Sequence, residues 1–475
     1  MSDLSQVPAL YEALQAYRMK GITSMHMPGH KGWAGSAQEL SWHLDITEID
    51  GFDNLHAAAG LLRDAQSRAS ALWGSASAFF LVNGSTAGIL AGIYACVQPG
   101  EKILVARNCH KSVYHAIELL RLTPIYLEPP ILAGTGICGS IPPEMVEEAL
   151  HIHPDVRMAV LTSPTYEGVL SDVGAIAAVL HECEIPLFVD EAHGAHLGLS
   201  SSFPIGAVSA GADLVVQSLH KTLPSLTQTG ILHLSGNLIS RERVQHALAV
   251  FQSSSPSYLL LASIDACVTE LAAHGDKRLA EWRARLDGFY RTVELKKLRL
   301  LTPEQDERCI YAHDPSKFVI LCENIDLSGA DVMNALRVDF GIELEMALGG
   351  YAIAMTGLNS TDEDLDRLRM ALQAVDGSCE PERRTRNAHP YPAMPEQVMP
   401  ASKALCATRR QLALRESAGC ISGTYLWAYP PGIPLLVPGV RITEEVIEAV
   451  TELTARGVEI KSTFQTQPGM GHVLK

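Results

Sequence analysis

The chain has 475 residues, of which 47% are hydrophobic and 19% are charged, and its formal net charge is −16. This length predicts roughly two or three domains, and the composition is typical of a globular protein. The acidic balance and the lack of a basic run argue against a nucleic-acid partner. The first residues lack the pattern of a signal peptide, and no apolar run reaches the ~18 residues that span a bilayer. We therefore expect no membrane partner.

Ten cysteines are scattered along the chain without a CxxC pair. This spacing predicts neither a disulfide framework nor a zinc ribbon, and it favours a reducing, cytoplasmic compartment. Residues 25–33 carry His26, His30 and Lys31, but no carboxylate or cysteine lies near them at a ligand spacing. We therefore expect no metal site.

The first 24 residues predict an N-terminal arm with a short helix from Val7 to Tyr17. A helix of that size cannot bury its apolar face alone, so we expect the arm to pack on the main body or on a partner subunit. After the arm, residues 60–75 have the apolar spacing of an amphipathic helix.

Residues 78–97 predict a strand, a turn at Asn83–Gly84 and a helix that begins near Ser85 and Thr86. Small hydroxyl residues at a helix N-terminus favour an anion such as a phosphate, and ordinary N-capping is the alternative explanation. Residues 102–120 repeat the order of strand, polar crossing and helix. His110 lies at that crossing, where an imidazole can stack on a flat ring.

Two short apolar runs, residues 185–189 and 214–216, each end abruptly in polar residues. Each run predicts a buried strand, and Asp190 follows the first strand while Lys221 closely follows the second. Ligands of open α/β sheets bind at the carboxyl ends of the strands. Asp190 and Lys221 are therefore expected to reach one small molecule. The alternative is two buried strands capped by solvated loops.

An acidic residue together with a lysine that follows Ser218 and His220 indicates pyridoxal phosphate (PLP) as the cofactor. The lysine would form a Schiff base, the carboxylate would meet the pyridine nitrogen, and small donors would hold the phosphate. Lys31 and Lys111 are rivals, because they also follow a histidine. Lys221 is preferred because it follows a strand and lies 31 residues after Asp190, which fits one strand-plus-crossover unit.

Repeated strand–helix units predict an α/β large domain at residues 25–275, with a mainly parallel, doubly wound sheet. Residues 276–375 contain short apolar runs and helical patterns that predict a smaller α+β domain. A capping box of Ser360 and Glu363 is expected to open its last helix.

Residues 376–400 are rich in proline and charge and predict a linker. Residues 401–475 predict a C-terminal α+β unit. This unit is expected to begin with a helix at 401–418, to place its prolines in an edge strand or loop, and to end with a strand near residue 462.

With these motifs in view, the chain resembles the Orn/Lys/Arg decarboxylase family over nearly its whole length. These are bacterial PLP enzymes with the aspartate-aminotransferase fold (PLP fold type I). Several strings in the right order are far more specific than any one of them. The strings are MPGHKG (27–32), NGSTAG (83–88), RNCHKS (107–112), SPTYEG (163–168), VDEAHGAHLG (189–198), SLHK (218–221), SYLLLASID (257–265) and YPPGIPLLVPG (429–439).

The resemblance implies a role for each matched residue. Lys221 is expected to form the Schiff base with PLP, and Asp190 is expected to pair with the pyridine nitrogen. His110 is expected to stack on the ring, and His193 is expected to lie near the Schiff base. The implied phosphate ligands are Ser85, Thr86, Ser218 and His220.

The reaction type also follows from the resemblance, because PLP equally supports transamination and aldol cleavage. A basic amino acid is the expected substrate in polyamine metabolism. Arginine, giving agmatine, is favoured over lysine, giving cadaverine, and ornithine ranks third. The distal cation needs a carboxylate, and Glu167, Glu343 and Glu345 are the candidates, although a structural role is the alternative for at least two of them.

Two other classes of function stay open at this point. One is another fold-type-I enzyme, an aminotransferase or an aldolase. The other is a catalytically silent PLP-binding regulatory homologue. Gly423 and Val440 stand where relatives often carry acidic residues, which leaves the contribution of the C-terminal unit to substrate choice open. The sequence shows no receiver-like wing domain, so a homodimer or a dimer of dimers is expected instead of a large ring.

Overall fold

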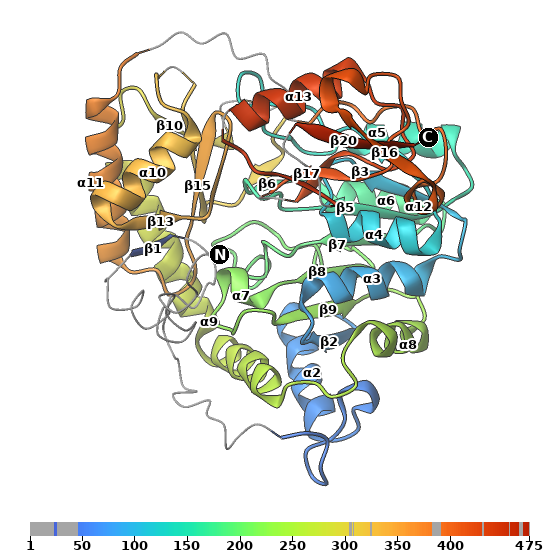
Figure 1. Cartoon of the computed structure of the whole chain (residues 1–475). Coiled ribbons are helices and arrows are strands. Elements are labelled where there is room, and N and C mark those ends of the chain that lie inside the picture. Colours follow the sequence, from blue (N-terminus) through green and yellow to red (C-terminus); the bar gives the residue numbers. More distant parts are fainter. Residues whose placement is uncertain are drawn as a thin grey trace, which may run out of the picture.

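The computed structural model describes residues 23–25, 46–303, 306, 308–323, 325–381, 391–429, 432–455, 457–464 and 469–474. These residues form a large α/β domain, a smaller α+β domain and a C-terminal unit (Figure 1). The predicted helix at Val7–Tyr17 and the string at residues 27–32 lie outside the described residues.

A seven-stranded sheet forms the centre of the large domain. Strand β9 runs antiparallel to both of its neighbours, whereas the other neighbouring pairs are parallel. This arrangement confirms the predicted α/β class with a mainly parallel sheet. In spatial order the strands are β2 (Ser77–Leu81), β9 (Gly230–Leu234), β8 (Leu214–Gln217), β7 (Leu187–Asp190), β5 (Val156–Thr162), β3 (Lys102–Ala106) and β4 (Thr123–Leu127).

Helix α3 is the large-domain helix that lies closest to the strands bearing the predicted site. It packs between α4 and α8 and contacts β7, β8 and β9. Its close approach requires glycine, because a Cβ atom at Gly92 would lie 2.5 Å from the ring of Phe188. The large-domain helices are α2 (Leu61–Trp73), α3 (Gly84–Cys96), α4 (Lys111–Leu120), α5 (Pro143–Ile152), α6 (Val173–Glu182), α7 (Leu219–Thr222) and α8 (Arg241–Phe251).

The long helix α9 (Tyr258–Thr292) connects the large domain to the small domain (Figure 1). It runs without a break through residue 276, the expected boundary between the two domains. The small domain contains an antiparallel sheet covered by α10 (Gly329–Phe340) and α11 (Asp362–Ser378). In spatial order its strands are β10 (Arg299–Leu300), β12 (Lys317–Leu321), β15 (Tyr351–Met355) and β14 (Met346–Leu348).

Two short strand pairs supplement this sheet. Strand β1 (Thr23–Met25) runs parallel to β13 (Ile342–Leu344). Strand β11 (Ala312–His313) pairs with β6 (Val169–Leu170), which belongs to the large domain. The β6–β11 pair therefore ties the small domain to the large-domain loop that follows β5.

Helix α11 begins one residue later than the sequence pattern predicted. Thr361 is the N-cap, and its hydroxyl accepts a hydrogen bond from the backbone N–H of Asp364 while the Asp364 carboxylate accepts from the N–H of Thr361. Ser360 instead accepts from the N–H of Gly357 and closes the preceding turn. The predicted capping box of Ser360 and Glu363 was therefore displaced by one position.

The C-terminal unit contains more strand than predicted. Helix α12 (Ala401–Cys406) is shorter than the predicted helix at 401–418, because the chain extends into β16 (Arg409–Ala413), which pairs with an unpredicted strand, β20 (Met470–Leu474). In a second sheet, Pro434 lies in an edge strand, as predicted, because proline has no N–H group to donate to a second neighbouring strand. Its strands are β18 (Ile433–Leu436), β17 (Leu426–Ala428) and β19 (Ile460–Ser462), and α13 (Glu444–Ala455) packs beside them.

Two hydrophobic cores hold these parts together. One core joins the central sheet and α3 to α6 with the C-terminal unit, and the other joins α2 and α9 with the small sheet around the buried Trp282. Each smaller unit thus shares a core with the large domain. No helix in the described part of the chain is long and apolar enough to cross a membrane.

We expect Gly92→Ala to lower the free energy of unfolding by about 1–3 kcal/mol, because the added methyl group overlaps the Phe188 ring. Gly288→Ala in α9 is the matched control, since no atom beyond the neighbouring backbone of its own helix lies within 4 Å of the new methyl group. That control should raise the free energy by up to about 1 kcal/mol. Urea unfolding measures both, and equal effects would contradict the close packing of α3.

Candidate active site

A cavity of about 540 Å³ lies at the carboxyl ends of β5, β7 and β8. All three parts of the chain line it. The large domain contributes Asp190 and Lys221, the small domain contributes Glu345, and the C-terminal unit contributes Tyr429. The predicted juxtaposition of strand ends is therefore present in the folded chain.

Lys221 is delivered by the short helix α7 directly after β8 ends. Its Nζ atom lies 2.7 Å from Nε2 of His193. Burial lowers the pKa of Lys221 to about 8, although Asp190 and Glu345 act in the opposite direction. Burial and the nearby Lys221 charge also hold the pKa of His193 well below its ordinary value. The pair therefore combines a nucleophilic amine with a neutral imidazole that can accept a hydrogen bond from it.

Asp190 is the last residue of β7, and the sheet register places it beside Thr162 of β5 and Val216 of β8. The residue is 4% exposed, and its carboxylate accepts a hydrogen bond from the N–H of Ala192. Burial raises the pKa of Asp190, and the positive charge of Lys221 opposes that effect. A carboxylate buried at a strand end in this way is suited to a cationic partner.

The four predicted phosphate ligands meet at the N-terminus of α3. The hydroxyl groups of Ser85 and Ser218 lie 2.6 Å apart, and His220 Nδ1 donates to the carbonyl of Thr229. Thr86, the next residue of α3, lines the same cavity. A helix N-terminus with hydroxyl and imidazole groups beside it is suited to a phosphate.

His110 is the N-cap of α4 and also lines the cavity. Its Nδ1 atom accepts from the N–H of Ser112, and burial lowers the pKa of the ring to about 3. Gly432 of the C-terminal unit approaches this ring closely, since a Cβ atom there would lie 3.4 Å from His110 Cδ2. Gly432 also accepts a hydrogen bond from the N–H of Lys111. The C-terminal unit therefore helps to set the position of His110.

Two of the three candidate carboxylates reach the cavity. Glu345 accepts a hydrogen bond from the Tyr166 hydroxyl, and Glu167 accepts one from the Tyr351 hydroxyl at 2.6 Å. Glu343 instead accepts three hydrogen bonds from the guanidinium of Arg337 and does not line the cavity. The chain bends at Glu345, between β13 and β14, so the two glutamates face different surroundings.

The rival lysines do not join this constellation. Lys111 lies with its Nζ atom over the rings of Trp427 and Tyr429, at 5.5 and 5.4 Å from their centroids. Lys31 falls outside the described residues. Of the two described lysines that directly follow a histidine, Lys111 and Lys221, only Lys221 has its amine beside His193.

Several residues that line the cavity were not predicted from the sequence. Thr227 and Gln228 belong to the turn between α7 and β9, and the closeness of that turn to Lys221 was an available signal. Asn108 and Tyr429 were quoted only within longer strings that carry the family resemblance, and Tyr391 comes from a distant segment for which the sequence offers no signal. Asn108 Oδ1 and His193 Nδ1 are buried and lack hydrogen-bond partners among the described residues.

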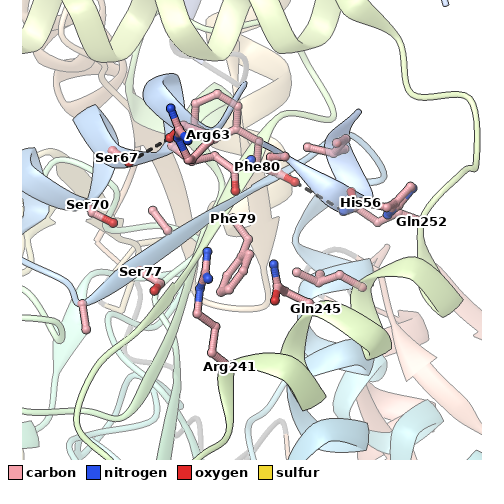
Figure 2. Close-up of a pocket in the computed structure, with 16 residues that line it drawn as sticks. His56, Arg63, Ser67, Ser70, Ser77, Phe79, Phe80, Arg241, Gln245 and Gln252 are labelled. Carbon is pink, nitrogen blue, oxygen red and sulfur yellow. Dashed lines mark hydrogen bonds between the residues drawn. The ribbon is translucent and has the colours of Figure 1, made fainter. Parts of the chain in front are cut away.

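A second cavity of about 370 Å³ lies between α2, β2 and α8, apart from these residues (Figure 2). Arg63 and Arg241 line it, together with serine and glutamine side chains. The Arg63 guanidinium is hydrogen-bonded to Asp64, and that of Arg241 lies 5.8 Å from the ring centroid of Phe79. None of the predicted site residues lines this cavity.

We expect the amine of Lys221 to show half-maximal acylation at about pH 8 in the full-length protein without added cofactor. A lowered pKa leaves more of the neutral, reactive amine at a given pH. Peptide mapping by mass spectrometry after brief labelling at several pH values measures this, with Lys277, whose side chain is 82% exposed, as the internal reference. Parallel pH profiles for the two lysines would refute the effect of burial.

Comparison with known proteins identifies the family. The model of the Orn/Lys/Arg decarboxylase major domain matches residues 8–307, and that of the C-terminal domain matches residues 384–470. Arginine decarboxylase of Bacillus subtilis is 33% identical over 98% of this chain and 97% of its own. Constitutive lysine decarboxylase of Escherichia coli is 23% identical over 92% of this chain and 76% of its own.

The fold agrees with these matches. Lysine decarboxylase A of Pseudomonas aeruginosa superposes with a TM-score of 0.75, covering 90% of this chain and 73% of its own at 20% identity. The predicted enzyme class, an amino-acid decarboxylase, is therefore confirmed. From the matched domains and the relatives it follows that this chain belongs to the Orn/Lys/Arg decarboxylase family.

Proposed function

We propose that the protein is a PLP-dependent decarboxylase of arginine that releases agmatine, with lysine as the second candidate substrate. The observation that carries the proposal is the convergence of Lys221, His193 and Asp190 in one cavity at neighbouring strand ends. Arginine is placed first because the relative named for arginine shares more of its sequence with this chain than the relative named for lysine.

The residues around the cavity fit PLP. Ser85 and Ser218 at the start of α3 are suited to its phosphate, and Asp190 is suited to its ring nitrogen. The unpartnered buried atoms His193 Nδ1 and Asn108 Oδ1 support a polar occupant, because buried polar groups are normally hydrogen-bonded. When bound, PLP supplies the electron sink that decarboxylation requires.

The residues of the chain orient the amine of Lys221. Lys221 is proposed to hold the cofactor covalently, and His193 Nε2, at 2.7 Å, is placed to accept a hydrogen bond from its amine and so to orient it. The low pKa of His193 keeps the imidazole neutral, so that Nε2 can accept a hydrogen bond from the amine.

Glu345 and Glu167 are proposed to hold the distal cation of the substrate. Each carboxylate lines the cavity and is oriented by a tyrosine hydroxyl, Tyr166 for Glu345 and Tyr351 for Glu167. A carboxylate with two oxygens suits the planar guanidinium of arginine, which donates two parallel hydrogen bonds.

We further infer a homodimer in a reducing, cytoplasmic compartment. Ile49, Phe52 and Leu61 are exposed large hydrophobic side chains within a short stretch, which supports burial of that surface by a second copy. All ten cysteines are free thiols, which supports a reducing compartment. Light scattering after size-exclusion chromatography tests the dimer.

We expect the purified, PLP-loaded protein to convert arginine to agmatine and CO₂, and Lys221→Ala to abolish this turnover. Product analysis with arginine, lysine and ornithine supplied separately identifies the substrate. Cadaverine as the dominant product would move the assignment to lysine. A keto acid or an aldehyde would establish a different fold-type-I reaction, and bound PLP without any turnover would establish a silent homologue.

We expect Glu345→Gln to lower kcat/KM for arginine by about 10- to 100-fold, because a hydrogen bond to a charged group contributes roughly 1.5–3 kcal/mol. Glu343→Gln is the matched control, since that carboxylate is bonded to Arg337 outside the cavity. The control should stay within about twofold of the unmodified enzyme. Steady-state kinetics measure kcat/KM for both variants. Equal losses of kcat/KM would show that Glu345 does not bind the substrate.

A further inference from the structure

Lys317 is a charged residue buried in the interior close to the candidate active site. It opens β12 of the small domain, and it is 0% exposed. Its Nζ atom donates to Asp314 Oδ2 at 2.8 Å, to Ser316 Oγ at 2.9 Å and to the backbone carbonyl of His193 at 3.1 Å. These three hydrogen bonds use all the donors of an ammonium group.

Asp314 completes a network that joins two domains. It is 0% exposed, and its second oxygen accepts hydrogen bonds from His196 Nε2 at 3.2 Å and from the N–H of Ser316. Burial alone would raise the pKa of Asp314, but the charges of Lys317 and His196 hold it well below its ordinary value. The large-domain loop after β7 is therefore bound to the small domain through an ionised, desolvated pair.

The same small-domain segment also holds the loop after β5. The N–H of Asp314 donates to the carbonyl of Gly168, and His313 Nε2 donates to the carbonyl of Glu167. A Cβ atom at Gly168 would lie 3.0 Å from Lys317 Cγ. The ring of Tyr166, in this loop, lies 4.2 Å from that of His193 between centroids. Lys317 and its neighbours thus contact both loops that frame His193.

We propose that Lys317 is a positioning residue, whose buried ammonium group holds the His193 backbone so that the imidazole meets the amine of Lys221. The inference rests on the proposed function. It explains why the chain keeps the buried ion pair of Lys317 and Asp314, whose removal from water costs free energy. A buried ion pair contributes little net stability compared with apolar residues of similar size, so its placement behind the catalytic imidazole points to a positional role. Small displacements of catalytic groups cost up to about 100-fold in rate.

The charge of Lys317 acts on the same pair. Burial is the main cause of the low pKa of Lys221, and the positive charge of Lys317 lowers it further. Removal of that charge therefore favours the protonated, unreactive amine. The titratable and charged groups that face Lys221 and His193 are His110, Tyr166, Asp190, His220, Lys317 and Glu345.

The test replaces the ion pair by neutral side chains, so that no buried charge is left alone. In the PLP-loaded full-length enzyme, we expect Lys317→Met with Asp314→Asn to lower kcat about 100-fold while KM stays within about threefold. Lys317→Gln with Asp314→Asn keeps an N–H donor for the His193 carbonyl, and it should recover about tenfold of that loss. Arg278→Met, which removes a partly buried ion pair with Glu270 in α9, controls for destabilisation.

A second readout does not depend on catalysis. In the same full-length variants without cofactor, acylation of Lys221 at pH 7 should slow about threefold for Lys317→Met with Asp314→Asn, and it should not change for Arg278→Met. Unchanged kcat and unchanged Lys221 labelling in the double variant would overturn the proposal. If the unmodified enzyme releases no amine from arginine, lysine or ornithine, the proposed function fails, whereas the labelling still decides whether Lys317 acts on Lys221.

Discussion

The parallel pairing of β7 with β8 is the constraint on which the site depends. Its register places Asp190 beside Val216, so the polar residues after both strands emerge at one edge of the sheet. Helix α3 then packs closely on these strands, which Gly92 permits, and its N-terminus arrives at the same edge with Ser85. A lysine, a carboxylate and a helix N-terminus suited to an anion therefore meet at one edge of the sheet.

Burial gives these groups their chemistry. Removal from water lowers the pKa of Lys221 to about 8 and keeps His193 neutral, because a low-dielectric interior disfavours the charged form of a base. The same burial raises the pKa of Asp190, so that its carboxylate depends on a cationic partner. The interior that stabilises the sheet thus also gives the site a reactive amine, a neutral imidazole and a carboxylate suited to a cation.

The site is nevertheless a product of docking between parts of the chain. The small domain contributes Glu345, and the C-terminal unit brings Gly432 against His110 and Tyr429 to the cavity. Both units share hydrophobic cores with the large domain, which holds them in place. Lys317 extends this arrangement, because its small-domain ammonium group donates a hydrogen bond to the backbone carbonyl of His193 in a large-domain loop. The packing of the domains against one another therefore also sets the geometry of the site.

The sequence by itself determined the strand–turn–helix units and the residues at their junctions, including Ser85, Asp190 and Lys221, because those signals are local. Only the tertiary structure shows that Glu345 lines the cavity and Glu343 does not, since two glutamates two residues apart look alike until the chain bends between β13 and β14. It also decided that residues 409–413 form a strand, because their partner lies some 60 residues later in the chain. Burial and pairing between distant segments depend on how the whole chain packs, and no local pattern encodes them.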